Sequence, residues 1–401
     1  MSYIENLLQG AEIEWKPLGD VAELKRGTSI TKKTSTEGKY PVISGGQQPA
    51  YYIDTFNRDG ETITVAGSGA YAGFVMFWNE PIFVSDAFSI KADEKQILSR
   101  YIYHFLLNIQ EKIHDLKAGG GVPHVYAKDV ARFLVPIPCP DNPTKSLEIQ
   151  RKIVEILDKF TTLEAELEAE LDCRRRQYEY YRNQLLSFDM LNRGGQRLNN
   201  IKIMSLGELG TFTRGSGLQK KDFTPTGIGC IHYGQIYTYY GTYAYKTKSF
   251  VSQEFAQKAR KAKNGDLIIA TTSENDEDVC KALTWLGDEE IAVSSDACFY
   301  AHTMNPKYVA YYFQTEQFQK QKRCFITGTK VRRVNSNDLA KIKIPVPPLA
   351  EQERIVSILD KFDTLTNSIS EGLPKEIELR RKQYEYYRNQ LLSFPEYKAT
   401  A

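Results

Sequence analysis

The chain has 401 residues, of which 41% are hydrophobic and 25% charged, and its formal net charge at pH 7 is +2. This length exceeds what one hydrophobic core usually organises, so we expect two or more domains. No apolar run approaches the roughly 20 residues that span a bilayer, and the N-terminus lacks a signal-peptide pattern, so we expect a cytoplasmic protein without membrane contact. The six cysteines include no C-x-x-C pair, which argues against zinc ribbons and dithiol redox motifs.

The first half of the chain begins with a short amphipathic helix, expected at residues 3–9. Residues 28–138 then have the pattern of a mixed α and β body. Apolar and β-branched runs bounded by Gly, Asn and Pro predict strands, at residues 61–66, 73–78 and 81–85. A helical period follows over residues 98–116, then a glycine-rich loop at 119–130 and an edge strand with prolines within 129–140.

A long helix is predicted from about residue 146 to residue 188, which would span about 60 Å at 1.5 Å per residue. Its apolar residues recur at steps of three and four, the heptad pattern of a coiled coil, at Ile149, Ile153, Ile156, Phe160, Leu163, Leu167, Leu171, Tyr178, Tyr181, Leu185 and Phe188. The middle contains LEAE twice in tandem, and each copy adds roughly one turn, about 6 Å. We interpret Leu163, Leu167 and Leu171 as the apolar seam of a spacer.

The second half of the chain repeats this plan with different residues. Strand-like and helical segments follow one another in the same order, and a second long helix is expected at residues 347–394. The segment QYEYYRNQLLSF closes both long helices, letter for letter, at residues 177–188 and 383–394. Identity of this length indicates an internal duplication.

The second long helix carries two breakers in its middle, Gly372 and Pro374. Proline costs about 3 kcal/mol in a helix interior because it removes a hydrogen bond and clashes with the preceding turn. We therefore predict a kink or break near residues 371–374.

These patterns predict a mixed α/β (α+β) fold with a pseudo-twofold internal repeat, in which two globular domains are separated by an antiparallel coiled coil of two long helices. The expected segments, in chain order, are a first domain with its N-terminal helix at 1–145, the first long helix at 146–188, a linker at 189–204, a second domain at 205–346, the second long helix at 347–394 and a tail at 395–401.

Motifs of common catalytic chemistry are missing. The sequence has no P-loop, no H-E-x-x-H and no [DNS]-P-P-[YFW], the signature that holds a flipped adenine in amino-methyltransferases. Residues 66–73, AGSGAYAG, are similar to G-x-G-x-x-G, but a strand pattern follows in place of a phosphate-binding helix. The five histidines have no ligand spacing, so we expect no catalytic residue, metal site or cofactor in this chain. Asp86 and Asp296 occupy matching S-D-A motifs, and we interpret them as capping a turn or orienting a loop.

Loops that differ between the two halves are rich in Lys, Arg, Gly, Ser, Thr and Gln. Arg and Lys bind guanine or phosphate, and Gln and Asn pair with adenine, so these loops are candidate nucleic-acid contacts. For any one residue an ordinary solvated loop is the alternative, and the recurrence across matching loops carries the interpretation. The candidates are Lys25, Arg26, Lys32, Lys33, Gln47, Ser68, Tyr71, His124, Lys128, Arg214, Gln219, Lys220, Lys221, Tyr233, Gln235, Thr272, Ser273, Thr329, Lys330, Arg332 and Arg333.

The repeated aromatic segments are candidate docking sites for another protein. Packing against a partner helix requires only apolar type and size, so it does not explain why the two segments are identical. Binding of two copies of one partner would explain it. The candidate docking residues are Tyr178, Tyr180, Tyr181, Arg182, Tyr384, Tyr386, Tyr387 and Arg388.

The motifs PLGDVAELKRG, the two ILDKF segments, the tandem LEAE and the repeated QYEYYRNQLLSF are similar to those of a known family. Across essentially its whole length the chain resembles specificity subunits of type I restriction–modification enzymes, most of all the type IC subclass. The resemblance implies that two target recognition domains each recognise one half of a split, asymmetric DNA sequence. It also implies that the coiled coil fixes their distance and that each repeated segment docks one methyltransferase subunit. One departure is the join at residues 189–207, which lacks the E-x-E-W of Glu12–Trp15.

The expected partners are therefore double-stranded DNA, two methyltransferase subunits and restriction (translocase) subunits. The resemblance places S-adenosylmethionine, ATP and Mg²⁺ in those partner subunits and makes this chain a non-catalytic subunit. Two alternatives remain at this point. Cleavage of DNA by the purified chain with a divalent metal would favour a self-contained nuclease, and a lack of salt-sensitive DNA binding would favour a coiled-coil scaffold without a DNA role.

Overall fold

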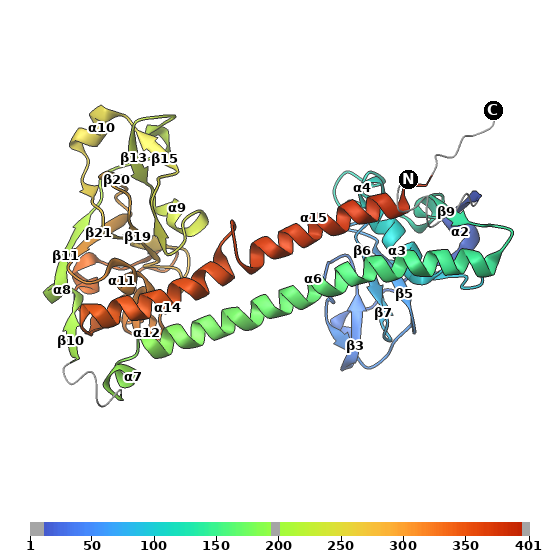
Figure 1. Cartoon of the computed structure of the whole chain (residues 1–401), viewed down its shortest axis with the longest axis horizontal. Coiled ribbons are helices and arrows are strands. Elements are labelled where there is room, and N and C mark those ends of the chain that lie inside the picture. Colours follow the sequence, from blue (N-terminus) through green and yellow to red (C-terminus); the bar gives the residue numbers. More distant parts are fainter. Residues whose placement is uncertain (1–11, 194–200, 395–401) are drawn as a thin grey trace. The chain divides into compact units, whose positions relative to one another are not determined.

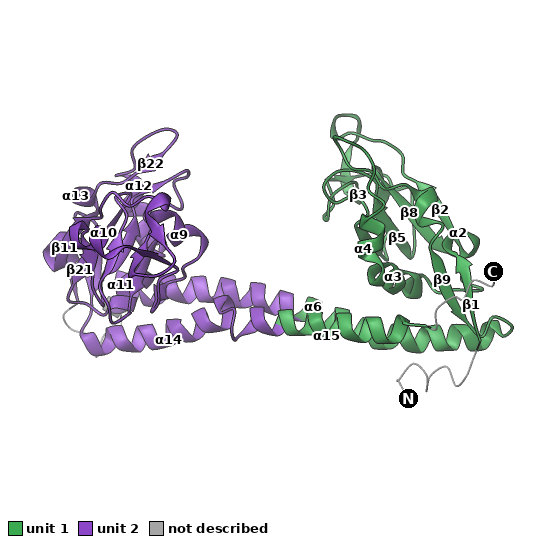
Figure 2. Ribbon diagram, turned by 90° about the horizontal axis from the view of Figure 1, so that it is seen from above, with its two compact units in different colours: residues 1–166, 377–401 green, residues 167–376 purple. Residues whose placement is uncertain are grey.

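The computed structural model describes residues 12–193 and 201–394, which fold into two compact units (Figures 1 and 2). Unit 1 comprises Met1–Glu166 and Ile377–Ala401, and unit 2 comprises Leu167–Glu376. Unit 1 therefore joins the first half of the chain to its last helix. The helix expected at residues 3–9, residues 194–200 of the linker and the tail at 395–401 lie outside the described residues.

Unit 1 contains a four-stranded antiparallel sheet, and its strands in spatial order are β2 (Ala22–Arg26), β8 (Ala87–Ala92), β5 (Thr62–Ala66) and β6 (Val75–Trp78). A three-stranded sheet contains β4 (Tyr52–Ile53), β3 (Glu37–Ile43) and β7 (Phe83–Val84), and a two-stranded sheet pairs β1 (Ile13–Pro17) with β9 (Leu134–Pro138). Strand β5 is buried along its whole length because its β-branched residues have both faces covered. The strands predicted in this half are thus confirmed as β5, β6 and β7.

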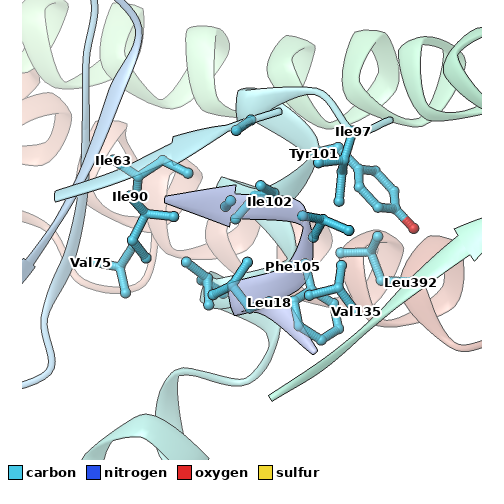
Figure 3. Close-up of a cluster of buried hydrophobic side chains, with 14 of the residues drawn as sticks. Leu18, Ile63, Val75, Ile90, Ile97, Tyr101, Ile102, Phe105, Val135 and Leu392 are labelled. Carbon is cyan, nitrogen blue, oxygen red and sulfur yellow. The ribbon is translucent and has the colours of Figure 1, made fainter. Parts of the chain in front are cut away.

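Figure 3 shows the hydrophobic core of unit 1, where helix α3 (Ser99–Asn108) packs against the four-stranded sheet. Ile63 and Ile90 come from neighbouring strands, and Ile102 comes from the helix. Leu392, which is close to the end of the last helix, belongs to the same buried cluster. The C-terminal segment of the chain therefore contributes to the core of unit 1.

Unit 2 repeats the arrangement on a larger scale, with two five-stranded sheets. The first contains, in spatial order, β11 (Gly210–Arg214), β21 (Ala297–His302), β17 (Leu267–Ala270), β19 (Ala282–Trp285) and β14 (Tyr243–Ala244). The second contains β12 (Phe223–Thr224), β15 (Ser249–Val251), β13 (Ile228–Ile231), β20 (Ile291–Val293) and β16 (Lys261–Ala262). Two further pairs are β10 (Lys202–Ser205) with β23 (Lys343–Val346) and β18 (Thr272–Ser273) with β22 (Arg332–Arg333).

Short helices connect these strands in both units, and unit 2 has more of them. In unit 1 they are α2 (Leu18–Val21), the 3₁₀ helix η1 (Lys32–Thr34), α4 (Gln110–His114) and α5 (Ala127–Val130). In unit 2 they are α8 (Leu206–Leu209), η2 (Lys220–Asp222), α9 (Tyr233–Thr238), α10 (Gln253–Lys258), α11 (Pro306–Phe313), α12 (Glu316–Arg323) and α13 (Ser336–Leu339).

The helix expected over residues 98–116 is two helices, α3 and α4, with a change of direction at Ile109. The side chain of Gln110, the first residue of α4, bonds to the sheet: its Nε2 donates to the carbonyl of Gly73 at 2.7 Å and its Oε1 accepts from the amide of Val75 at 3.3 Å. These bonds tie the start of α4 to the edge of the sheet.

The internal repeat extends to single hydrogen bonds. The hydroxyl of Tyr101 donates to the carbonyl of Pro136 at 3.0 Å, and that of Tyr308 donates to the carbonyl of Pro345 at 2.9 Å. In unit 1 this bond joins α3 to the proline-containing strand β9, and in unit 2 it joins α11 to the proline-containing strand β23. The duplication therefore preserved the way in which the helix is fastened to the sheet.

The long helices follow the sequence prediction closely. Helix α6 (Pro143–Leu185) has 43 residues, about 64 Å at 1.5 Å per residue, and α7 (Phe188–Arg193) follows it. The second long segment is divided into α14 (Leu349–Asn367) and α15 (Leu373–Leu392), so the predicted break is confirmed. Gly372 has φ +82°, and a Cβ there would lie 2.3 Å from the carbonyl oxygen of Thr364, which only glycine avoids.

Each unit contains an antiparallel pair made from these helices. In unit 1 the rings of Phe160 and Tyr387 stack with centroids 5.2 Å apart, and Glu164 pairs with Arg381 at 2.5 Å. The direction is antiparallel because the partner position decreases along α15 as the position along α6 increases. In unit 2 the rings of Tyr181 and Phe362 lie 5.6 Å apart. The repeated segments thus pack reciprocally, since Phe160 and Phe362 are equivalent, as are Tyr387 and Tyr181.

The predicted fold class is confirmed: mixed α and β structure with two globular bodies and two long helical segments. Within residues 12–193 and 201–394, no helix is both long and apolar enough to cross a membrane. The same residues contain no group of three or more His, Cys, Asp or Glu side chains arranged to hold a metal ion.

Candidate nucleic-acid interface

The candidate loops of unit 1 converge at Ser68, just beyond the end of strand β5. A Cβ on Gly45 would lie 2.4 Å from the carbonyl oxygen of Ser68, so the loop at residues 44–48 passes directly over it. Ser68 forms an isolated β-bridge with His124, and its hydroxyl donates a short hydrogen bond to Asp86. The expectation that Asp86 orients a loop agrees with this bond.

A fourth loop reaches the same end of the sheet through Arg26 and Gly27. The amide of Gly27 donates to the carbonyl of Ala87 at 2.8 Å. A Cβ on Gly27 would lie 2.2 Å from the carbonyl oxygen of Ser85, so the close approach of these two strands requires glycine. The Arg-Gly motif therefore brings Arg26 to the end of the sheet where Asp86 lies, and both residues line one cleft.

The four candidate loops of unit 2 converge in the same way. The amide of Gly215 donates to the carbonyl of Ala297 at 3.0 Å, as Gly27 does in unit 1. The amide of Tyr233 donates to the hydroxyl of Ser294 at 2.8 Å, and the Tyr237 hydroxyl donates to the carbonyl of Thr272 at 2.7 Å. Strand β18 pairs with β22, and this pairing brings in the fourth candidate loop, at residues 327–333.

Each convergence point has a small cleft. The cleft of unit 1 has a volume of about 80 Å³, and its side chains are those of Arg26, Asp86, Ala87, Phe88, His124, Val125, Tyr126 and Ala127. The cleft of unit 2 has a volume of about 270 Å³, and its side chains are those of Arg214, Thr271, Thr272, Ser295, Asp296, Cys298, Thr327, Arg333, Val334, Asn335 and Ser336. An arginine, an aspartate and a buried valine occur in both, whereas the other side chains differ.

Most of the predicted contact residues are exposed. The exposed ones are Lys25, Arg26, Lys32, Lys33, Gln47, Tyr71, Lys128, Arg214, Gln219, Lys220, Lys221, Thr329, Lys330 and Arg333. Those of intermediate exposure are Ser68, His124, Tyr233, Gln235, Ser273 and Arg332. Lysines in this set can bind phosphate without any further structure around them.

Several of the predicted contact residues are engaged within the fold. Ser68 donates to Asp86, as described above, and Nε of Arg214 donates to the carbonyl of Ser295 at 3.0 Å. Thr272 is buried. The side chain of Gln235 accepts from the amide of His232 at 3.0 Å and donates to the hydroxyl of Ser249 at 2.7 Å. Arg332 pairs with Asp276 at 2.8 Å. The side chains of Gln235 and Arg332 therefore position loops. The sequence does not indicate this, because Ser249 and Asp276 lie in other segments of the chain.

Sequence reasoning missed Tyr126 in the cleft of unit 1. Its ring stacks on that of His124 with centroids 6.1 Å apart, and the Lys128 ammonium lies 5.6 Å from the Tyr126 centroid. The spacing of two residues between His124 and Tyr126 places them on one face of an extended segment, which is a signal the sequence does contain.

The repeated aromatic segments present the same surface in each unit. Tyr180 and Tyr386 are 59% and 60% exposed, and Tyr181 and Tyr387 are both 40% exposed. The rings of Tyr180 and its neighbour Tyr181 meet edge to face with centroids 5.4 Å apart, and so do those of Tyr386 and Tyr387. Exposed tyrosine pairs of matching geometry are suited to bind two copies of one partner.

Tyr178 and Tyr384, by contrast, are buried and serve the fold. Burial raises the pKa of both phenols, which keeps them protonated as hydrogen-bond donors. The guanidinium of Arg182 lies over the Tyr178 ring at 5.0 Å, and that of Arg388 lies over the Tyr384 ring at 5.1 Å. Internal packing therefore accounts for part of the identity between the two segments, including Tyr181 and Tyr387, which stack on Phe362 and Phe160. It leaves Tyr180 and Tyr386 unexplained.

The predicted spacer residues Leu163, Leu167 and Leu171 all lie on α6 and are of intermediate exposure. Their role as the apolar seam of a spacer stays a prediction. The chain therefore contains two duplicated bodies with unlike clefts and two long helical segments.

Comparison with known proteins identifies the class. A family model described as "Type I restriction modification DNA specificity domain" matches residues 11–172 and 199–379. The chain is 34% identical to the Escherichia coli type I restriction enzyme EcoR124I/EcoR124II specificity subunit over 98% of each chain. It therefore belongs to the family of type I restriction enzyme specificity subunits.

Solved structures agree with this fold. A type I restriction–modification S subunit from M. genitalium superposes with a TM-score of 0.57 at 17% identity, covering 96% of this chain and 98% of that one. A chain from a structure of the type I R-M system, solved to explain complex assembly and conformational transition, gives a TM-score of 0.59 at 14% identity and covers 95% and 97%.

Proposed function

We propose that this chain is the DNA-recognition subunit of a type I restriction–modification complex and that each unit recognises one half of a bipartite, asymmetric DNA site. One observation carries the proposal: the same backbone frame occurs in both units and holds different side chains in its cleft. Two such frames would place equivalent parts of the protein against two unlike half-sites. The shared arginine and the surrounding lysines would supply the contacts to phosphate.

The long helices would set the distance between the half-sites. The exposed tyrosine pair on each repeated segment would dock one adenine methyltransferase subunit, and restriction subunits would join through these. The chemistry would belong to those partners, with S-adenosylmethionine in the methyltransferase and ATP and Mg²⁺ in the restriction subunits. The chain itself would supply recognition and assembly.

The test is methylation in a host that lacks adenine methylation of its own. The chain is expressed together with the methyltransferase subunit of its system, and the modified adenines are mapped across the genome. We expect one asymmetric motif of two half-sites separated by a gap of unspecified bases. Each protein expressed alone is the control and should give no motif. An assembled complex that methylates nothing, or a single uninterrupted motif, would contradict the proposal.

A further inference from the structure

The clefts of the two units are built on the same backbone hydrogen bonds. In unit 1 the amide of Val125 donates to the carbonyl of Gly67 at 3.1 Å, and in unit 2 the amide of Val334 donates to the carbonyl of Thr271 at 3.1 Å. Both valines are buried, so each fixes its segment against the sheet. The residue before each valine is therefore held at an equivalent position.

That residue is His124 in unit 1 and Arg333 in unit 2. His124 exchanges two backbone hydrogen bonds with Ala118 at 2.8 and 3.0 Å, and Arg333 exchanges two with Thr327 at 2.9 Å each. Each also pairs with the segment that follows an inner strand of its sheet: His124 forms a bridge with Ser68 after β5, and Arg333 pairs with Thr272 after β17. The main chain is thus locked in both units, and only the side chain differs.

Neither side chain makes a hydrogen bond or an ion pair within the described parts of the chain. In the described parts of the chain the Arg333 guanidinium has no hydrogen-bond or ion-pair partner. Its neighbour Arg332, which points to the opposite face of β22, is held by Asp276 and by the carbonyl of Gly328 at 2.5 Å. The ring nitrogens of His124 likewise make no hydrogen bond within the described residues, although the ring stacks on Tyr126.

The two side chains differ in the bases they can recognise. Arginine presents a planar fork of donors that fits O6 and N7 of guanine. Neutral histidine presents one donor and one acceptor and cannot form that pair. A contact with a base edge specifies sequence, whereas a contact with phosphate does not.

We propose that His124 and Arg333 are equivalent specificity-determining residues, each contacting a base edge in the half-site recognised by its own unit. The inference rests on the proposed function and assigns the difference between the half-sites in part to this one position. Arg333 would select a guanine, and His124 would select a different base at the corresponding place.

The test is a reciprocal exchange, His124→Arg and Arg333→His, with methylated adenines mapped for each complex. Each variant should change the preferred base at one position of one half-site and leave the other half-site as in the wild type. Losing a bidentate contact should reduce discrimination there by about 5- to 140-fold. The two variants must affect opposite half-sites, so each serves as the control for the other.

Lys330→Ala is a further control in unit 2, because an exposed lysine that contacts phosphate should weaken binding without changing the sequence recognised. If the wild-type complex methylates a bipartite motif and both exchanges leave it unaltered, the inference is overturned while the proposed function stands. If the wild-type complex gives no bipartite motif, the proposed function itself fails.

Variants that abolish methylation are assayed by selection from random-sequence DNA with the assembled complex, together with the smaller changes His124→Gln and Arg333→Gln. Recovery of the wild-type sequence in that selection overturns the inference. An altered preference confined to one half-site supports it.

Discussion

The hydroxyl of Tyr384 lies 2.9 Å from Nδ1 of His104, and Nε2 of the same ring lies 2.7 Å from a carboxylate oxygen of Asp158. Burial lowers the pKa of His104 despite the hydrogen bond with Asp158, so the ring is neutral at pH 7. We assign the proton to Nε2, which leaves Nδ1 to accept from Tyr384. The second copy of the repeated segment is thus fastened to the first body through a fully buried histidine.

Replacing Tyr384 with phenylalanine should destabilise unit 1. The substitution keeps the ring but leaves Nδ1 of His104 buried without a donor, which costs about 1–3 kcal/mol of unfolding free energy. Tyr178→Phe is the matched control, because the Tyr178 hydroxyl lies 3.5 Å from Asp363, at the limit of a hydrogen bond. Denaturant unfolding should show a clearly smaller loss for Tyr178→Phe. Equal losses would contradict the role assigned to the His104 contact.

The stability of unit 1 should fall as the pH is lowered through about 6.5. Because the pKa of His104 is lower in the folded state, the unfolded chain binds more protons below the ordinary histidine pKa of about 6.5. Burial alone would raise the pKa of Asp158, but hydrogen bonds from His104 and Arg100 lower it, so its contribution is lost only at more acidic pH. Unfolding measured at pH 7.5 and 5.5 should show a smaller pH effect in His104→Gln. An unchanged pH effect in that variant would exclude His104 as a source.

His302 should produce a similar loss in unit 2. Burial lowers its pKa to about 4, so acidification from pH 7.5 to 5.5 should remove about 1 kcal/mol of unfolding free energy. Its ring lies 4.9 Å from that of Tyr300, so His302→Phe keeps the aromatic contact and removes the titrating group. We expect this variant to equal or exceed the wild type in stability at pH 5.5. A variant that keeps the full pH dependence would assign the effect to another group.

The sequence predicts much of the architecture because the internal duplication can be recognised from repeated sequence segments. The repeated segments, the heptad seam and the breakers Gly372 and Pro374 are all local patterns, and local patterns determine helices. The sequence does not predict which body each copy of QYEYYRNQLLSF packs against. Tyr178 and Tyr384 have identical neighbours in sequence, so an apolar period identifies a buried face without identifying its partner.

In the candidate interface, too, the sequence does not predict which of two similar residues contacts which partner. Arg332 and Arg333 are adjacent residues of one type, and composition gives no reason to distinguish them. The pairing of β22 with β18 directs Arg332 towards Asp276 and leaves Arg333 in the cleft. Strand register is a tertiary property, so it decides which arginine is free to contact a ligand.

Replacing Tyr180 and Tyr386 with alanine should impair assembly with the methyltransferase subunit and leave the fold intact. Both rings are more than half exposed, so their removal opens no cavity in a core. Tyrosines at the centre of an interface commonly contribute enough for association to weaken by about tenfold or more on truncation. Each single variant should lose one partner, giving a 1:1 complex in native mass spectrometry where the wild type gives two partners per chain. A double variant that still binds two partners would place the docking surface elsewhere.

Deleting residues 167–170, the second LEAE unit, should shorten the gap between the half-sites. Four helical residues correspond to about 6 Å, close to the rise of one or two base pairs at 3.4 Å each. The bases of both half-sites should stay the same, because every candidate contact lies outside α6. Leu167→Ala is the control, since it alters the seam but keeps the helix length, and its methylation motif should retain the original gap. Altered half-sites in the deletion variant would mean that the helix acts on base recognition itself, which is incompatible with a spacer.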